Sequence, residues 1–398
     1  MSDNEYDVII VGAGPAGNIA ARVLAEDNLD VIVLEKRQEI GSPKRCAEGI
    51  NLRGLNAVGL EPNSKWINNR IRGAILYSPS GKGVRMEIEG IEGYILERKI
   101  FEKYLARDAI RAGAEYMVKT RVHGVIKEGE KVTGVRAEFM NEDLEFKSKI
   151  VIAADGVDSR IAKSAGIDSK NKLTDYHSGF QYEMCNLKLN DPDMLHIFFG
   201  TEIAPKGYLW IFPKDGDVAN VGIGILGVES GDGKRAKDYL DRFIEEHPEI
   251  FKNSSPIEIN SGGVPVSSGI DTFVADGFMI VGDAAQQVNP IHGGGIAIAM
   301  RSASIAADVA AGAIKEGNVS GERLYEYEKI WRETEGRKME KLYRLRMFLE
   351  KLDDKDFEKL AEILEGRDIM ELVEGRYKFL AKLFATKAPQ MLALMKNF

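Results

Sequence analysis

A glycine pattern near the N-terminus constrains the fold of this chain more than any other feature of its sequence. Gly12, Gly14 and Gly17 form G-x-G-x-x-G directly after an apolar run over residues 8–11 and at the start of an expected helix over 15–26. In such a turn the first glycine permits the tight bend, the second lets the backbone approach a pyrophosphate, and the third lets helix and strand pack closely. The pattern therefore predicts a Rossmann-like unit with phosphates at a helix N-terminus.

Glu35 ends the next expected strand, which covers residues 31–34. It follows Gly17 by 18 residues, close to the ~20 at which an acidic side chain binds a ribose diol in dinucleotide-binding folds. The glycines alone would be weak evidence, because an ordinary structural turn gives the same pattern. Strand, turn, helix and acidic residue in this order favour dinucleotide binding.

Composition argues against several other classes of protein. The 398 residues carry a net charge of −8, without the basic footprint of nucleic-acid binding. Because Cys46 and Cys185 are the only cysteines and the five histidines lack metal-ligand spacing, we expect no disulfide framework, no metal site and a reducing, cytoplasmic setting. The apolar stretch around residues 296–314 is interrupted by Arg301 and Asp308, so no membrane span is expected.

Two later segments place an acidic residue beside a glycine. Asp155 and Gly156 lie in AADGVDSR, and Gly282 and Asp283 lie in IVGDAAQQVNPIHGGG. Together with the N-terminal glycines, they resemble the large flavoprotein family that includes aromatic hydroxylases and geranylgeranyl reductases. The resemblance implies that FAD is the dinucleotide and that Asp283 hydrogen-bonds its ribityl chain. A helix after glycines 293–295 would then point its N-terminus at the pyrimidine edge, where a reduced flavin is anionic.

The same resemblance implies the rest of the cofactor site. Arg98, at the start of an expected helix, would reach the ribityl and phosphate groups, and the backbone of Val122 would contact the adenine. A surface arginine and a core valine are the alternative readings. The implied FAD-binding residues are Gly12, Gly14, Ala16, Gly17, Glu35, Cys46, Ala47, Gly49, Arg98, Val122, Asp283, Gly294, Gly295 and Ile296.

Two short segments narrow the resemblance. KRCAEGI, residues 44–50, lies in the loop that this family brings against the flavin ring, and it resembles the C-x-x-G segment of geranylgeranyl reductases. YLWIFP, residues 208–213, resembles their Y-x-W-x-F-P signature. The resemblance covers roughly residues 5–320. It implies a reductase that hydrogenates the geranylgeranyl chains of digeranylgeranylglycerophospholipids in archaeal ether-lipid biosynthesis.

The aromatic residues of YLWIFP alternate along an expected strand. Tyr208, Trp210 and Phe212 therefore share one strand face. They either line a prenyl pocket, where their rings stabilise positive charge, or pack in a core. Cys46 either gates the pocket or packs beside the flavin ring, and its thiol is also a candidate proton donor, with bound water as a rival donor. His292 is a second candidate acid, although a loop side chain that contacts backbone is the favoured interpretation.

Two other functions share parts of this pattern. An FAD-dependent aromatic-ring monooxygenase using NAD(P)H would have the same FAD segments, and a non-catalytic flavin-containing lipid-binding protein would have the same pocket. Because the chain has one G-x-G-x-x-G, it offers no second nucleotide domain for NAD(P)H. The expected electron donor is either NAD(P)H or a ferredoxin-like carrier protein.

These features predict a mixed α/β (α+β) fold. We expect a discontinuous, Rossmann-like FAD-binding domain of the aromatic-hydroxylase type from residues 1–60, 95–165 and 265–320. An antiparallel-sheet substrate domain is expected from residues 61–94 and 166–264, followed by a helical C-terminal region over 321–398.

The C-terminal region is rich in basic residues. Residues 337–346 carry five Lys or Arg and one acidic residue, and residues 376–398 carry five and none. A basic amphipathic helix can lie on an anionic bilayer or bind a phosphate head group, and it can also dock on the protein by its apolar face. We expect peripheral contact with the cytoplasmic face of the membrane, with Lys338 or its basic neighbours near the head group of the substrate.

Overall fold

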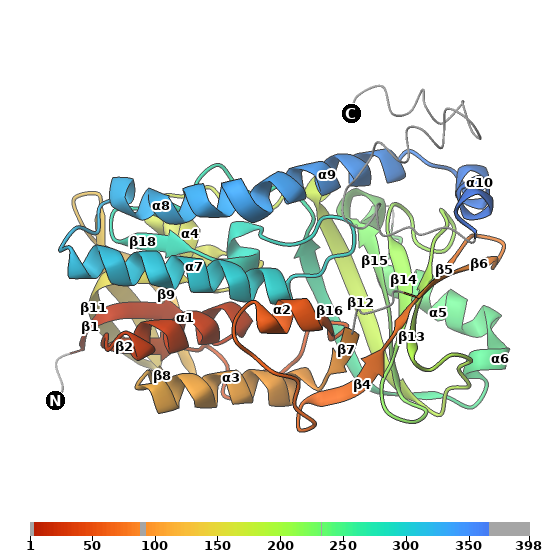
Figure 1. The fold of residues 1–398 in the computed structure, drawn as a ribbon, viewed down its shortest axis with the longest axis horizontal. Coiled ribbons are helices and arrows are strands. Elements are labelled where there is room, and N and C mark those ends of the chain that lie inside the picture. Colours follow the sequence, from red (N-terminus) through yellow and green to blue (C-terminus); the bar gives the residue numbers. More distant parts are fainter. Residues whose placement is uncertain (1–3, 88–92, 232, 366–398) are drawn as a thin grey trace.

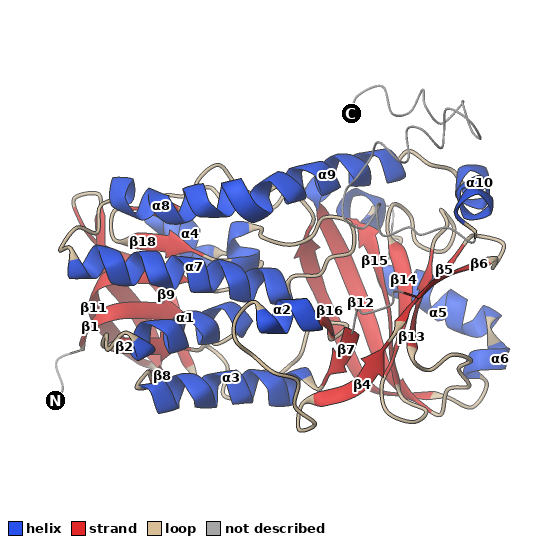
Figure 2. Cartoon of the chain, viewed as in Figure 1, coloured by secondary structure: helices blue, strands red, loops and turns tan. Residues whose placement is uncertain are grey.

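The computed structural model describes residues 4–87, 93–231 and 233–365. Figures 1 and 2 show two parts built on separate sheets, with a layer of C-terminal helices that runs along both. The predicted amphipathic segment over 376–398 lies outside the described residues.

The first part is an eight-stranded sheet with the path β17-β18-β11-β1-β2-β8, from which β10 and β9 branch beside β11. Its strands are β1 (Glu5–Val11), β2 (Val31–Leu34), β8 (Glu115–Met117), β9 (Thr120–Glu128), β10 (Lys131–Phe139), β11 (Glu142–Ala153), β17 (Val274–Ala275) and β18 (Phe278–Ile280). The pairs β11–β1, β1–β2, β2–β8 and β11–β18 are parallel. Strands β9, β10 and β11 pair antiparallel in sequence order and so form a meander.

Helices cover this sheet because its central strands are apolar on both faces. Every residue of β2 and β18 is buried, as expected for parallel strands beneath helices. Helix α1 (Pro15–Glu26) packs on both α3 (Arg98–Ala112) and α7 (Ile296–Lys315). Among the described helices, α7 is the one long and apolar enough to cross a membrane. Most of its apolar window is buried inside the protein, as in a core helix.

The second part is a seven-stranded sheet with the order β16-β12-β15-β14-β13-β5-β6. Its strands are β5 (Gly73–Tyr77), β6 (Gly83–Glu87), β12 (Tyr176–Cys185), β13 (Met194–Phe198), β14 (Tyr208–Pro213), β15 (Ala219–Leu226) and β16 (Ser255–Pro265). Helices α5 (Ala236–Glu246) and α6 (Pro248–Phe251) cover its outer face. The sheet departs from the expected antiparallel arrangement at one pair, because β5 and β13 are parallel. These strands belong to separate excursions of the chain, so no hairpin constrains their direction.

The excursion over residues 61–94 divides between two sheets. Strands β5 and β6 join the large sheet, whereas β4 (Ile67–Ile71) and β7 (Gly93–Leu96) form a three-stranded sheet with β3 (Gly49–Asn51). Helix α2 (Leu52–Asn56) follows β3, and α4 (Arg160–Ala165) packs on β9. Strand β3 begins within the KRCAEGI segment, at Gly49, so the loop before it lies where the two large sheets approach each other.

The C-terminal helices are α8 (Gly321–Trp331), α9 (Arg337–Leu349) and α10 (Asp354–Leu364), with one π-helical segment over Arg332–Gly336 between the first two. Leu345 and Phe348 of α9 form a hydrophobic cluster with residues of α10 and with Val84 of β6. The basic segment over 337–346 is therefore docked on the body of the protein, with Arg346 buried against the carbonyl oxygens of Val266 and Thr174.

Candidate active site

A cavity of about 1530 Å³ lies between the two large sheets. It begins at the glycine turn after β1, passes the KRCAEGI loop and β14, and reaches helices α9 and α10. One continuous space therefore connects the predicted nucleotide site, the aromatic strand and the C-terminal helices.

The glycine turn forms one end of this cavity. Gly14 is the N-cap of α1, has φ −75°, and would place an added Cβ with no atom within 4 Å. The helix N-terminus is therefore open to a phosphate group. Gly12 has φ +105°. Gly17 does not line the cavity but serves close packing, because a Cβ there would lie 1.9 Å from the carbonyl oxygen of Gly12.

Glu35 is held rigidly beside this turn. Its carboxylate accepts hydrogen bonds from the backbone N–H groups of Ala13 and Arg37, both at 2.8 Å. The side chain lines the cavity, and each carboxylate oxygen retains a lone pair for a hydroxyl donor. This geometry suits the predicted ribose contact, and Val122 and Ala16 line the same end.

Asp283 and the start of α7 form the central part of the cavity. Burial raises the pKa of Asp283, and the positive charge of Arg98 acts in the opposite direction. Gly294, Gly295 and Ile296 line the cavity at the N-terminus of α7. These two helix N-termini, with a carboxylate between them, can bind a long ligand that carries phosphates at one end and developing negative charge at the other.

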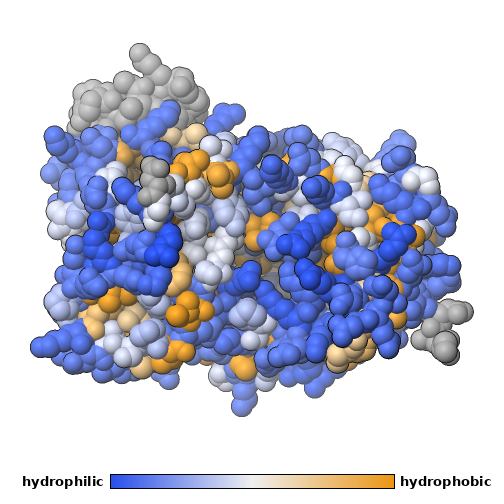
Figure 3. Space-filling model, turned by 180° about the vertical axis from the view of Figure 1, so that it is seen from behind, coloured by the Kyte–Doolittle hydropathy of each residue, from blue (hydrophilic) through white to orange (hydrophobic). Residues whose placement is uncertain are grey.

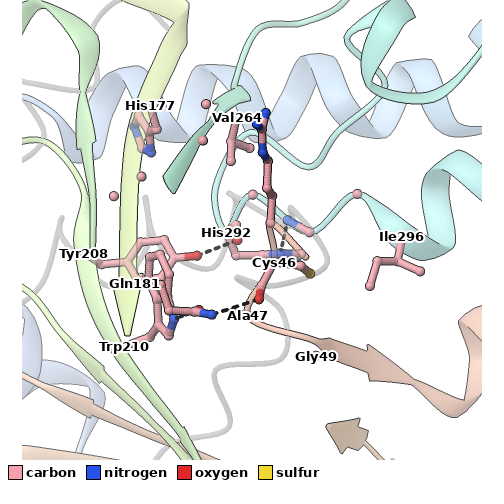
Figure 4. A pocket seen from close by; sticks show the side chains of 18 of the residues that line it. Cys46, Ala47, Gly49, His177, Gln181, Tyr208, Trp210, Val264, His292 and Ile296 are labelled. Carbon is pink, nitrogen blue, oxygen red and sulfur yellow. Dashed lines mark hydrogen bonds between the residues drawn. The ribbon is translucent and has the colours of Figure 1, made fainter. Parts of the chain in front are cut away.

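The aromatic side chains of β14 face the cavity and not a core. Tyr208, Trp210 and Phe212 line the cavity, whereas the alternate residues Leu209 and Ile211 are fully buried in the core. The ring centroid of Trp210 lies 5.6 Å from that of Tyr208 and 6.4 Å from that of Phe212. The three rings therefore form a continuous wall of the cavity, and Figure 4 shows Tyr208 and Trp210 of this wall.

Gly222 of β15 makes room for the central ring of this wall. It pairs in register with Trp210, and a Cβ at this position would lie 2.4 Å from Cζ2 of the indole. The indole therefore lies flat over the neighbouring strand. Sequence patterns miss this role, because a glycine in a strand gives no sign of which side chain crosses it.

The loop residue His292 contacts backbone through its side chain. Its Nδ1 accepts a hydrogen bond from the backbone N–H of Gly294 at 3.1 Å, and its carbonyl oxygen accepts one from the Tyr208 hydroxyl at 2.5 Å (Figure 4). Burial and the charge of Lys338 lower the pKa of His292 to about 4. It is therefore neutral at pH 7. Lys338 itself is exposed and is not among the residues that line the cavity.

Among the buried polar residues of the cavity face that were not predicted are His177, Gln181 and Asn260. His177 and Gln181 lie on one face of β12, and Asn260 pairs in register with Gln181 from β16. Neither amide atom of Asn260 makes a hydrogen bond within the described part of the chain. Alternation along these strands was the available signal, but it does not distinguish a cavity face from a core face.

His177 should make the stability of the protein depend on pH. Burial and the charge of Arg346 lower its pKa to about 4, against ~6.5 in an unfolded chain. The unfolded chain therefore binds the proton more tightly, so this contribution is complete above pH ~6.5 and is lost as the pH falls toward 4. Between pH 7.5 and 5 the free energy of unfolding of the wild type should fall by about 2 kcal/mol more than that of His177→Gln. Urea unfolding at each pH measures this difference. Equal losses in the two proteins would contradict this assignment.

Comparisons with known proteins agree with the geometry. A family model described as FAD dependent oxidoreductase matches residues 7–172, and one described as Geranylgeranyl reductase catalytic domain matches residues 175–264. A flavin-dependent brominase has the same fold, with a TM-score of 0.72 at 20% identity over 93% of this chain and 92% of its own. The open glycine turn, Glu35 and Asp283 fit an FAD molecule extended through the cavity. The chain is an FAD-dependent oxidoreductase.

Closer relatives define the family. The chain is 43% identical to digeranylgeranylglycerophospholipid reductase of Methanocaldococcus jannaschii over 98% of both proteins. It is 45% identical to the protein of the same name from Methanosarcina acetivorans, over 95% of this chain and 94% of that one. A geranylgeranyl bacteriochlorophyll reductase-like protein of Thermoplasma acidophilum has a TM-score of 0.92 at 38% identity over 99% of both chains. The chain belongs to the geranylgeranyl reductase family.

Proposed function

We propose that this protein hydrogenates the C=C bonds of the geranylgeranyl chains in digeranylgeranylglycerophospholipids. The observation that carries the proposal is the continuity of the cavity. Beyond the aromatic wall it continues to an apolar end, lined by Val84 and Met86 of β6 and by residues of α9, α10 and the turn between them: Leu345, Phe348, Leu349, Leu352, Phe357 and Leu360. A long prenyl chain needs this length of apolar surface, whereas a single aromatic ring does not.

The side chains of the cavity suit reduction of an unpolarised alkene. Bound in its reduced form, FAD supplies the hydride for one carbon of the double bond, and the other carbon takes a proton. The rings of Tyr208, Trp210 and Phe212 stabilise positive charge that develops on the alkene. The apolar walls exclude bulk water around the chain and position it by packing. Cys46 and bound water are both candidates for the proton donor.

Two features of the proposal concern partners. The electron donor is NAD(P)H or a ferredoxin-like carrier protein. A lipid substrate and the basic segment over 376–398 support peripheral contact with the cytoplasmic face of a membrane. The face in Figure 3 is largely hydrophilic, with hydrophobic residues in small separate groups. We assign the contact to the side of the protein on which α9 and α10 line the cavity.

Flavin reoxidation under anaerobic conditions tests this function. The protein is reduced with dithionite and mixed with a digeranylgeranylglycerophospholipid or, separately, with its fully saturated analogue. We expect the absorbance of oxidised flavin to return with the unsaturated lipid and not with the saturated one. A flavin that stays reduced with both lipids until oxygen enters would favour the monooxygenase. A flavin that dithionite and other donors fail to reduce would favour the lipid-binding protein.

A further inference from the structure

The Cys46 loop, defined here as residues 44–49, is anchored to the seven-stranded sheet through its backbone. The carbonyl oxygen of Cys46 accepts a hydrogen bond from Nε2 of Gln181 at 3.0 Å, and that of Ala47 accepts one from Nδ2 of Asn220 at 3.2 Å. The backbone N–H of Glu48 donates to Sγ of Cys46 at 3.1 Å, which orients the thiol. Glu48 has φ +73°, a conformation that its surroundings must enforce.

A buried charge cluster enforces that conformation. The carboxylate of Glu48 is fully buried, and it accepts hydrogen bonds from Nζ of Lys44 at 2.9 Å, Nδ2 of Asn220 at 2.8 Å and the backbone N–H of Arg98 at 2.8 Å. Lys214 approaches the same carboxylate at 3.2 Å. Burial would raise the pKa of Glu48, but the charges of Lys44 and Lys214 outweigh it and lower the pKa. Glu48 is therefore ionised, and the cluster fixes the loop electrostatically.

Gln181 connects this loop to the aromatic wall. While its Nε2 donates to Cys46, its Oε1 accepts a hydrogen bond from Nε1 of Trp210 at 2.9 Å (Figure 4). The side chain is buried, with 3% exposed. Because Gly222 lets the indole lie over the sheet, the bond to Gln181 sets the rotation of the ring within that space.

We infer that Gln181 is a positioning residue, which couples the Trp210 ring to the Cys46 loop so that both face the reacting part of the cavity in one fixed arrangement. The effect of this positioning on lipid turnover rests on the proposed function. Gln181 acts through other groups: its Nε2 donates to the carbonyl oxygen of Cys46 and, at 3.2 Å, to Oδ1 of Asn220, and its Oε1 accepts from Trp210.

Thiol alkylation tests the positioning role without any lipid. In FAD-loaded protein carrying Cys185→Ser, Cys46 is the only cysteine, so the rate of alkylation by N-ethylmaleimide reports the position of the loop. We expect Gln181→Leu to raise this rate about fivefold, because the loss of one ordinary hydrogen bond raises the population of the displaced loop by about this factor. Gln181→Glu keeps an acceptor for Trp210 but has no donor for the Cys46 carbonyl, so its rate should rise as much.

Two further variants serve as controls. Trp210→Phe keeps the bond between Gln181 and the loop, so its alkylation rate should rise less than that of either Gln181 variant. Asn260→Leu removes a buried amide from the paired position on β16 and should leave the rate within about twofold, because Asn260 makes no hydrogen bond to the loop. Unchanged alkylation in both Gln181 variants would overturn the inference. Since the assay needs no lipid, failure of the proposed function would leave the rates as expected while turnover is absent from every variant.

Discussion

Replacing Trp210 with alanine is expected to leave FAD bound but to lower the rate of lipid turnover about 100-fold. The indole is the central ring of the aromatic wall, in contact with both Tyr208 and Phe212. Its removal opens a space in which the prenyl chain is no longer held against the reacting centre, and it removes the ring that best stabilises positive charge. The measurement is the single-turnover rate of flavin reoxidation, with FAD content determined from absorbance.

A graded variant distinguishes the wall from general damage to the sheet. Trp210→Phe retains an aromatic ring at the same place, so its turnover should fall by about tenfold at most. Trp210→Ala with unchanged turnover would remove the aromatic wall from the mechanism. Loss of FAD from both variants would instead assign the ring a structural role.

Replacing Gly14 with valine is expected to weaken FAD binding strongly while the protein still folds. The position has φ −75°, and no atom lies within 4 Å of an added Cβ, so the folded protein accommodates the side chain. That free space is the approach to the N-terminus of α1, which the pyrophosphate would occupy. Loss of two charge-assisted hydrogen bonds, about 4 kcal/mol, would weaken FAD binding by about three orders of magnitude. Fluorescence titration of the apoprotein with FAD measures the affinity.

Gly231→Val is the matched control for this variant. Gly231 has φ −70° and the nearest atom to an added Cβ lies at 3.6 Å, and the residue does not line the cavity. Its FAD affinity and unfolding midpoint should match those of the wild type. Normal FAD affinity in Gly14→Val would contradict the assignment of the glycine turn to the pyrophosphate.

Local sequence patterns predicted the parts of the site that are formed by residues close together in the sequence. The β1-turn-α1-β2 unit, Glu35 and the shared face of Tyr208, Trp210 and Phe212 follow from spacing and alternation, because each is determined by a few consecutive residues. Phosphate-binding glycines also need an open backbone, and the structure provides it at Gly14.

Long-range features could not be predicted in this way. Lys44 and Asn220, which both contact Glu48, are 176 residues apart in the sequence, and no local pattern indicates that they meet. The same holds for the addition of β5 beside β13 and for the apolar end of the cavity under α9 and α10. Basic residues suggested a surface role for residues 337–346, yet the apolar residues between them docked this helix and buried Arg346.

The mass of the lipid product tests the central claim most directly. Dithionite-reduced protein is incubated anaerobically with a digeranylgeranylglycerophospholipid, and the extracted lipid is analysed by mass spectrometry. We predict a mass gain of two hydrogens for each double bond reduced, with no oxygen incorporated. A lipid of unchanged mass, recovered from protein whose FAD is fully reduced, would contradict the account.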